Sequence, residues 1–290
     1  MDQHMAGVSE QSPARPRPPF PLERLEEPDT IDDVLRNIDQ IIDWSINAQS
    51  NIGYFAVLYK RVTVAIREAI NDGVFDDGHR IEQLDVVFAH RYFNALNAYF
   101  YPDEYQGPTL PWEVAFVGDQ NDQAIILQHM MTGLNAHITF DLGLAVLAIA
   151  ANSLDKLEND FNRVNALLCS QIPGILGVVE QLSPEFRWIR RVLPNEVALL
   201  KRMVTKLRRS AWYFAIYMAL HPENAREKRV NQESWTAAMG AWYLQPPTRF
   251  TPFPMLVRAI AKRESRDVAA NLRALATIKN TPEKLDKSYL

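Results

Sequence analysis

The chain has very little cysteine and few histidines. Cys169 is the single cysteine in 290 residues, and only six histidines are present. One thiol can form neither an intramolecular disulfide nor a cysteine-based zinc site. Cys169 directly follows the apolar residues Ala166, Leu167 and Leu168, so we predict that it is a small core residue. A free thiol also fits a reducing compartment.

Three further features are missing from the sequence. It has no glycine-rich phosphate loop, no internal repeat and no useful run with the period-2 pattern of a strand. The net charge of -4 and the pI of about 5.9 argue against a general nucleic-acid binder, which is usually basic. We therefore expect no nucleic-acid partner. The N-terminus lacks the apolar segment of a signal peptide, so we expect a cytoplasmic protein.

Helical periodicity is what the sequence does contain. Apolar residues recur at i, i+3, i+4 and i+7 through most of the chain, which predicts an all-α fold. We predict one multi-helix domain over 29–280, preceded by a disordered proline-rich tail over 1–28 and followed by a flexible terminus over 281–290. The expected helices begin at Thr30, which can cap the first of them, and continue over 52–72, 80–100, 122–152, 154–182 (with a kink or break at Pro173-Gly174), 195–221, 223–244 and 254–278.

The stretch from Asp122 to Asn152 is predicted to be the central helix of this bundle. Apolar side chains surround it on all sides, as in a helix enclosed by other helices or by lipid. Polar residues interrupt the run, and its clean apolar part, Leu142 to Ala151, is far shorter than the ~20 residues of a membrane span. We therefore predict a buried helix and no membrane span.

This central helix carries a cluster of polar groups that are costly to bury without partners. His137 and Asp141 are four residues apart, so they share one helix face and can share a metal ion, a water or a proton. His129 lies two turns earlier and leans away from His137, because helical side chains point toward the N-terminus. A separate polar stripe can hydrogen-bond either a ligand or an adjacent helix; it consists of Gln128, Thr132, Asn135 and Thr139.

Two other predicted helices contribute charged residues. Asp85 lies close beside the apolar face that includes Tyr92, and Arg91 points about 120° away from it around the helix. The partner of Asp85 should therefore come from another helix. Farther along the chain, a basic flank near Trp212 is either a solvated face or a clamp for phosphate or carboxylate; its members are Lys201, Arg202, Lys206, Arg208 and Arg209.

The polar cluster has three possible roles. It can be a buried hydrogen-bond network that includes Asp85 and an arginine and fixes the helix register. It can be a metal-free active site in which His137 or His129 is a general base oriented by Asp141 or Asp85. It can also be a site for a divalent metal ion such as zinc, held by His137, Asp141 and groups from other helices.

Four segments resemble the signature segments of an uncharacterised, mainly bacterial family, catalogued as domain of unknown function 5995. They are YFAVLYKRVTVAI (54–66), LDVVFAHRYFNAL (84–96), QHMMTGLNAHITFDLGLA (128–145) and RRSAWYFA (208–215). The resemblance spans about 52–220 and implies no established activity. It raises the importance of the positions that match its recurrent pattern, which are Asp85, Arg91, Tyr92, Gln128, His129, Gly133, Asn135, His137, Asp141 and Trp212.

A looser likeness connects the chain to the all-helical, zinc-dependent phospholipase C and single-strand nuclease group. Those enzymes also place His and Asp four residues apart on central helices. Their histidine-rich ligand set is absent here, because the chain has six histidines and His4 lies in the predicted tail. The likeness therefore transfers no ligands.

The function we expect is that of a small-molecule enzyme, hydrolytic or biosynthetic, acting on an apolar substrate. His137 and Asp141 would be the catalytic or metal-ligating pair, with His129 and Asp85 as further polar partners. The alternative is a non-catalytic helical protein that binds a lipid-like ligand or a protein partner, with a purely structural polar cluster. The expected ligand-binding residues are Gln128 and Asn135, which would orient the substrate, Arg91 or Arg209, which would pair with a carboxylate, and Tyr92 and Trp212.

Overall fold

The computed structural model describes residues 20–121, 123–150, 153–185, 195–247 and 253–277. Every regular element in these ranges is a helix, which confirms the predicted all-α fold. The longer elements are α1 (Ile31–Ala48), α2 (Ile52–Asn71), α3 (Gly78–Phe100), α4 (Leu110–Val117), α5 (Ile126–Asn135), the π-helical turn η2 (Ala136–Asp141), α6 (Leu142–Ala150), α7 (Leu154–Leu182), α9 (Glu196–Leu220), α10 (Ala225–Leu244), α11 (Phe253–Ala261) and α12 (Val268–Ala276). Short 3-10 turns are η1 (Gly118–Gln120) and η3 (Pro222–Asn224).

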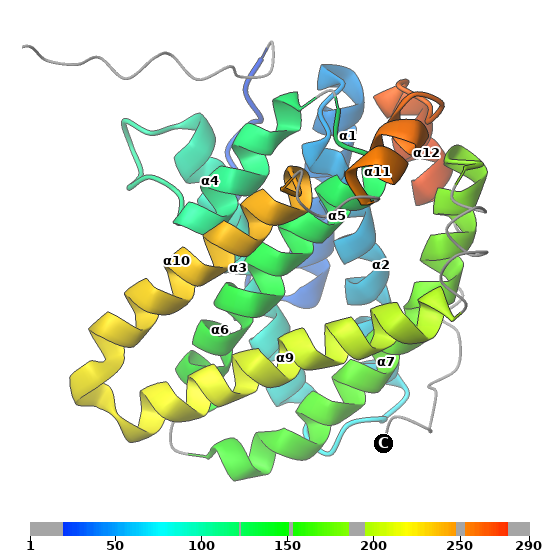
Figure 1. Cartoon of the computed structure of the whole chain (residues 1–290). Helices are drawn as coiled ribbons and strands as arrows, with labels where there is room; N and C mark the ends of the chain where they lie inside the picture. The colour runs from blue at the N-terminus through cyan, green and yellow to red at the C-terminus, as the bar shows by residue number, and fades with distance from the viewer. Residues whose placement is uncertain (1–19, 122, 151–152, 186–194, 248–252, 278–290) are drawn as a thin grey trace, which may run out of the picture.

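The central helix of the fold consists of α5, η2 and α6 in direct succession. It packs against α2 and α3 on one side and against α9 and α10 on the other. In Figure 1 it is the green helix that runs between α10 and α9. Residues Ile126–Ala150 have the length and apolar character of a membrane span, but 72% of their most apolar window is buried within the bundle. Such burial is typical of a core helix, and the prediction that no segment spans a membrane remains a prediction.

Local sequence signals explain where several helices begin and end. Thr30 caps α1: its side chain accepts a hydrogen bond from the backbone of Asp33, whose carboxylate in turn accepts one from the backbone of Thr30. Gly73 follows α2 with a φ of 66°, a conformation that glycine adopts at little cost. Asp77 caps α3 by accepting a hydrogen bond from the backbone of Arg80.

The predicted disorder over 1–28 does not hold for residues 20–28, because this segment packs against the bundle. Leu22 and Leu25 are buried. The side chain of Asn97 exchanges two hydrogen bonds with the backbone of Leu25, and the hydroxyl of Tyr101 donates to the carbonyl of Leu22. Asn97 in α3 and Tyr101 just after it thus provide hydrogen bonds to the backbone of a segment that cannot form a helix. Residues 1–19 and 281–290, which include the rest of the predicted tail and the predicted flexible terminus, lie outside the described residues.

Two further predictions about helices need correction. The single helix expected over 254–278 is two helices, α11 and α12, and the carboxylate of Asp267 caps the second by accepting from the backbone of Ala270. Of the kink or break expected at Pro173-Gly174, the break is excluded, because α7 continues through this proline as one helix. The neighbouring Gly174 leaves space for an arginine: a Cβ at this position would lie 2.7 Å from Nη2 of Arg61.

Candidate functional site

A cavity of about 110 Å³ lies between α2, α3, the central helix, α7 and α9. Its wall is almost entirely apolar, and the polar side chains on it are those of Tyr59, Asp85, His137 and Arg208. The volume is of the same order as the ~150 Å³ of an engineered apolar cavity that binds benzene. The cavity is therefore large enough for an apolar group of a ligand.

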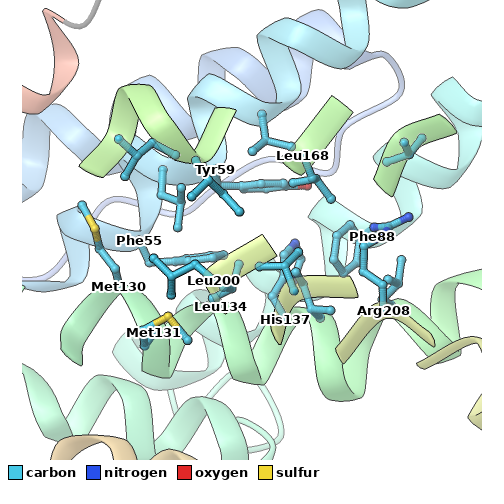
Figure 2. Close-up of a pocket in the computed structure, with 18 of the residues that line it drawn as sticks. Phe55, Tyr59, Phe88, Met130, Met131, Leu134, His137, Leu168, Leu200 and Arg208 are labelled. Atoms are coloured by element: carbon cyan, nitrogen blue, oxygen red, sulfur yellow. The ribbon is translucent and has the colours of Figure 1, made fainter. Parts of the chain in front are cut away.

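The two ends of the cavity differ in chemistry. Figure 2 shows Met130 and Met131 at one end and Phe88 and Arg208 at the other, with His137 nearer to the second end. Several wall residues of α5, α7 and α9 are only half-buried, so the apolar wall extends to solvent there; these are Leu127, Met131, Leu134, Leu168, Ile172, Leu200 and Met203. The arrangement is that of an apolar channel with an arginine at one end.

His137 lies in a cage of aromatic rings on the cavity wall. Its ring stacks on Phe88 with a centroid distance of 3.5 Å, and the centroids of four further rings lie within 6.0 Å: Phe55, Tyr59, Tyr92 and Trp112. Neither ring nitrogen has a hydrogen-bond partner among the described residues. Burial lowers the pKa of His137, and the nearby Asp141 opposes this shift only in part. The ring is therefore neutral near pH 7.

Asp141 belongs to the same π-helical turn and forms a buried polar network. Its Oδ1 accepts a hydrogen bond from Nε of Arg91 at 3.0 Å, and its Oδ2 accepts one from Nε1 of Trp112 at 2.6 Å. Nδ1 of His137 lies 3.5 Å from Oδ2, beyond normal hydrogen-bond length. Burial alone would raise the pKa of Asp141, but His137, Arg91 and Trp112 together lower it, so the carboxyl is ionised.

The pairing of His137 with Asp141 that the four-residue spacing predicted is present, but it does not support the metal hypothesis. Both carboxylate oxygens of Asp141 already accept hydrogen bonds from Arg91 and Trp112. Within the described ranges, no group of three or more His, Cys, Asp or Glu side chains is placed to hold a metal ion. His137 and Asp141 thus lack further protein ligands that a zinc site would need.

The π-helical conformation of residues 136–141 is a feature that the sequence analysis missed. A π-helical turn contains one more residue than an α-helical turn, and such turns are frequent at functional sites. The periodicity of the apolar residues gives no signal for it. Its position at His137 and Asp141 coincides with the cavity wall and the buried network.

Asp85 is a buried acid that faces the cavity without a partner. It is 4% exposed, and its Oδ2 accepts no hydrogen bond from any described residue. Burial raises the pKa of its carboxyl to about 7, with a smaller contribution from Glu82. The partner that we expected from another helix is not found among the described residues, and Arg91 pairs with Asp141, as its direction on the helix allowed.

Arg208 is the cavity arginine, and the sequence analysis placed it in the basic flank, which was predicted to be either a solvated face or a clamp for phosphate or carboxylate. It is 3% exposed, its Nη2 donates to the carbonyl of Phe161 at 3.2 Å, and its guanidinium lies 4.2 Å from the Phe161 ring centroid. Its Nε has no partner among the residues that the structure describes. Burial lowers its pKa to about 9, so it is still a cation near pH 7. The sequence did contain a sign that Arg208 is buried: it follows the apolar residues Leu200 and Val204 at four-residue intervals and therefore shares their helix face.

Three other predicted ligand-binding residues do not line this cavity. Arg209 is exposed to solvent. Trp212 is buried against Phe161, with ring centroids 4.7 Å apart, and Tyr92 stacks on Trp112, also at 4.7 Å. The cavity arginine is thus the neighbour of Arg209, and Arg91, the other arginine predicted to pair with a carboxylate, instead pairs with Asp141.

The polar stripe on the central helix bonds to an adjacent helix, which was one of its two predicted roles. Nε2 of Gln128 donates to the carbonyl of Tyr243 at 2.6 Å, and Nδ2 of Asn135 donates to the carbonyl of Thr236 at 2.8 Å. Both acceptors belong to α10. Gln128 and Asn135 therefore hold α10 against the central helix and do not line the cavity of His137.

His129 lines a separate small cavity of about 90 Å³ between α5, α2 and the region of α12. The centroid of its ring lies 6.1 Å from that of Tyr54, and Glu264 lies on the same wall. Burial lowers the pKa of His129 to about 4. The structure thus separates His129 from His137, as its position two turns earlier on the helix predicted, and brings Asp85, His137 and Arg208 to one cavity.

Comparison with known proteins gives a family but no activity. No curated protein and no solved structure matches the chain significantly. The family model matches residues 31–246, which run from α1 to just past the end of α10 and include every residue that lines the cavity of His137. The chain therefore belongs to the family of unknown function DUF5995.

Proposed function

We propose that this protein binds an elongated apolar molecule with a carboxylate at one end, such as a fatty acid. The apolar chain would occupy the channel toward Met130 and Met131, and the carboxylate would pair with Arg208. The observation that carries the proposal is the guanidinium of Arg208, a buried cation on a largely apolar wall whose Nε has no partner among the described residues. A buried charge without a partner is costly, and an anionic ligand would remove that cost.

The ligand class follows from the shape and charge of the site. Arginine pairs well with planar anions, because its N–H groups match the geometry of a carboxylate. Flexible methionines at the other end suit a variable apolar chain. In this proposal Asp141, Arg91 and Trp112 fix the position of His137 and hold the wall, and they do not contact the ligand.

Fatty-acid titration of paired arginine variants tests this proposal. We expect palmitate to bind the wild-type protein in isothermal titration calorimetry, and Arg208→Met to bind it at least tenfold more weakly. Arg209→Met is the matched control, because Arg209 is the next residue on α9 but is exposed, and it should bind like wild type. Equal affinity of Arg208→Met and wild type, or equal affinity for palmitate and its methyl ester, would contradict the proposal.

A second candidate function is acid–base catalysis on the bound molecule, and Asp85 is the observation that favours it. Its pKa of about 7 is near the optimum for a general acid or base at neutral pH. A carboxyl in an apolar cavity can transfer a proton to or from a weakly polar substrate without competition from water. We place this chemistry at Asp85 because the carboxylate of Asp141 is occupied by Arg91 and Trp112.

Deuterium exchange separates the enzyme from the non-catalytic carrier. Lipid that copurifies with the protein would be incubated with it in D₂O and analysed by mass spectrometry. An enzyme that moves a proton at carbon should introduce deuterium, and Asp85→Asn should still bind the lipid but introduce none. Binding without exchange in the wild-type protein would favour the carrier.

A further inference from the structure

The solvent side of α9 carries one continuous stripe that is basic in its first half and apolar in its second. Its members are spaced three or four residues apart, so they share one helix face: Leu199, Arg202, Lys206, Arg209, Tyr213, Tyr217 and Leu220. All of them are exposed. The stripe lies on the opposite side of α9 from Arg208, which faces the cavity.

The apolar members of this stripe are unusually open to water. The exposed fractions are 54% for Leu199, 62% for Tyr213, 37% for Tyr217 and 69% for Leu220. Large apolar side chains gathered on one exposed face, with polar residues around them, mark an interaction surface. We therefore expect the stripe to bind a partner that makes apolar contacts.

The basic half of the stripe adds a condition on the charge of that partner. Arg202, Lys206 and Arg209 form no ion pair with the described residues. Residues 195–244 hold seven Lys or Arg besides the buried Arg208 and four Asp or Glu, whereas the whole chain has a net charge of -4. Positive charge is thus concentrated on the α9–α10 hairpin, and a partner for this surface should be anionic.

Helix α10 extends the surface beside the apolar half of the stripe. Nζ of Lys228 lies 5.2 Å from the ring centroid of Tyr217, which connects the start of α10 to the stripe. Trp235 and Trp242 follow Lys228 at seven-residue intervals and are 61% and 36% exposed. In Figure 1 the two helices meet at one end and diverge from there, with the central helix between them, so Lys228 at the start of α10 is the residue that lies next to the apolar half of the stripe.

We propose that this α9–α10 surface binds the surface of an anionic lipid bilayer. Tyr and Trp favour the membrane interface, Lys and Arg are attracted to anionic headgroups, and exposed leucines can insert among the acyl chains. A nucleic acid would match the basic half, but it would leave Leu199 and Leu220 without apolar contacts. The acidic remainder of the chain would orient this face toward the bilayer.

This inference does not depend on the cavity or on its ligand. It uses only exposed residues of α9 and α10, whereas the proposed fatty-acid site uses the inner side of α9. Should both hold, the helix that touches the bilayer is also the helix that carries Leu200, Met203 and Arg208 of the cavity wall.

Vesicle cosedimentation tests the proposal with two stripe variants. We expect the full chain to bind phosphatidylglycerol-containing vesicles at least tenfold more strongly than pure phosphatidylcholine vesicles, and to dissociate at high salt. The apolar variant is Tyr213→Ser/Tyr217→Ser/Leu220→Ser, and the charge variant is Arg202→Glu/Lys206→Glu/Arg209→Glu. Each should bind about tenfold more weakly, because the apolar and electrostatic contributions both count.

The matched controls make the same kinds of substitution, apolar to polar and basic to acidic, at exposed residues outside this surface. Met255→Ser removes a side chain of α11 that is 66% exposed, and Arg258→Glu/Arg273→Glu reverses two exposed charges on α11 and α12. These controls should bind like wild type, and circular dichroism should show all variants folded. Absence of wild-type binding, equal binding to both kinds of vesicle, or stripe variants that bind like the controls would overturn the proposal. Binding of a DNA duplex without binding of vesicles would overturn it in favour of a nucleic-acid surface.

Discussion

Nε of Arg91 on α3 lies 3.0 Å from Oδ1 of Asp141 in the π-helical turn. This bond ties α3 to the central helix, and Asp141 is 1% exposed. Arg91→Leu would leave a buried carboxylate with only Trp112 as a strong donor. We expect the free energy of unfolding to fall by about 3 kcal/mol, as when one member of a buried ion pair is removed. Urea denaturation at pH 7 measures this loss.

Arg67→Leu is the control for that experiment. Arg67 pairs with Asp32 at 2.7 Å, but the two side chains are 37% and 64% exposed. Exposed ion pairs contribute about 0–1 kcal/mol, so this variant should be close to wild type. Equal losses in the two variants would show that the Arg91–Asp141 pair has no special structural role.

Asp85 should make the protein less stable as the pH rises. Its pKa is about 7 in the folded protein and 3.8 as the ordinary value, so the unfolded chain releases this proton first. The free energy of unfolding therefore falls between pH 4 and pH 7 and levels off above pH 7. Asp85→Asn should remove this loss and be more stable than wild type at pH 8, by on the order of 2–4 kcal/mol. Thermal unfolding at pH 4 and pH 8 measures the difference, and a constant difference between the two proteins would contradict it.

His129 has the opposite effect on the acid side. Its pKa falls from 6.5 to about 4 on burial, so the unfolded chain takes up this proton first as the pH decreases. The corresponding stability is complete above pH 6.5 and is lost as the pH falls toward 4, with an upper limit of about 3 kcal/mol. His129→Gln should flatten this part of the profile. Because Asp85 acts in the opposite direction, the contrast is clearest in the Asp85→Asn background, with the exposed His221→Gln as the control.

Gly133 is required by close packing and not by backbone conformation. A Cβ at this position would lie 2.6 Å from Cγ of Phe55, a side chain of the cavity wall. Gly133→Ala should therefore lower the free energy of unfolding by about 1–3 kcal/mol through overpacking. Gly177→Ala on α7 is the matched control, because a Cβ there meets nothing within 4 Å. It should raise stability by about 0.5–1 kcal/mol, since alanine is the better helix former.

The helices could be predicted because their signals are local. The Thr30 cap, the end of α2 at Gly73 and the four-residue spacing of His137 and Asp141 all depend on residues within about one helical turn of each other. The packing of residues 20–29 could not be predicted in this way. The hydrogen bonds that hold Leu25 come from Asn97, which is 72 residues farther along the chain.

The candidate site could not be predicted fully, because the sequence does not determine which way each helix turns its side chains. Arg208 and Arg209 differ by about 100° around one helix, and this rotation places the first in the cavity and the second in water. Asp85 was identified as a buried acid, but no rule of spacing indicates that its carboxylate lacks a partner. Such features follow only from how separate helices meet.

The π-helical turn bears on which deletions the central helix can tolerate. A π-helical turn holds one residue more than an α-helical turn. Insertions and deletions usually survive in surface loops. Here the loss of one residue from 138–140 would return the turn to α-helical geometry and shorten the spacing of His137 and Asp141 from four residues to three, which still leaves both on one helix face. Such a deletion should therefore preserve the central helix while it shifts Asp141 relative to Arg91 and Trp112.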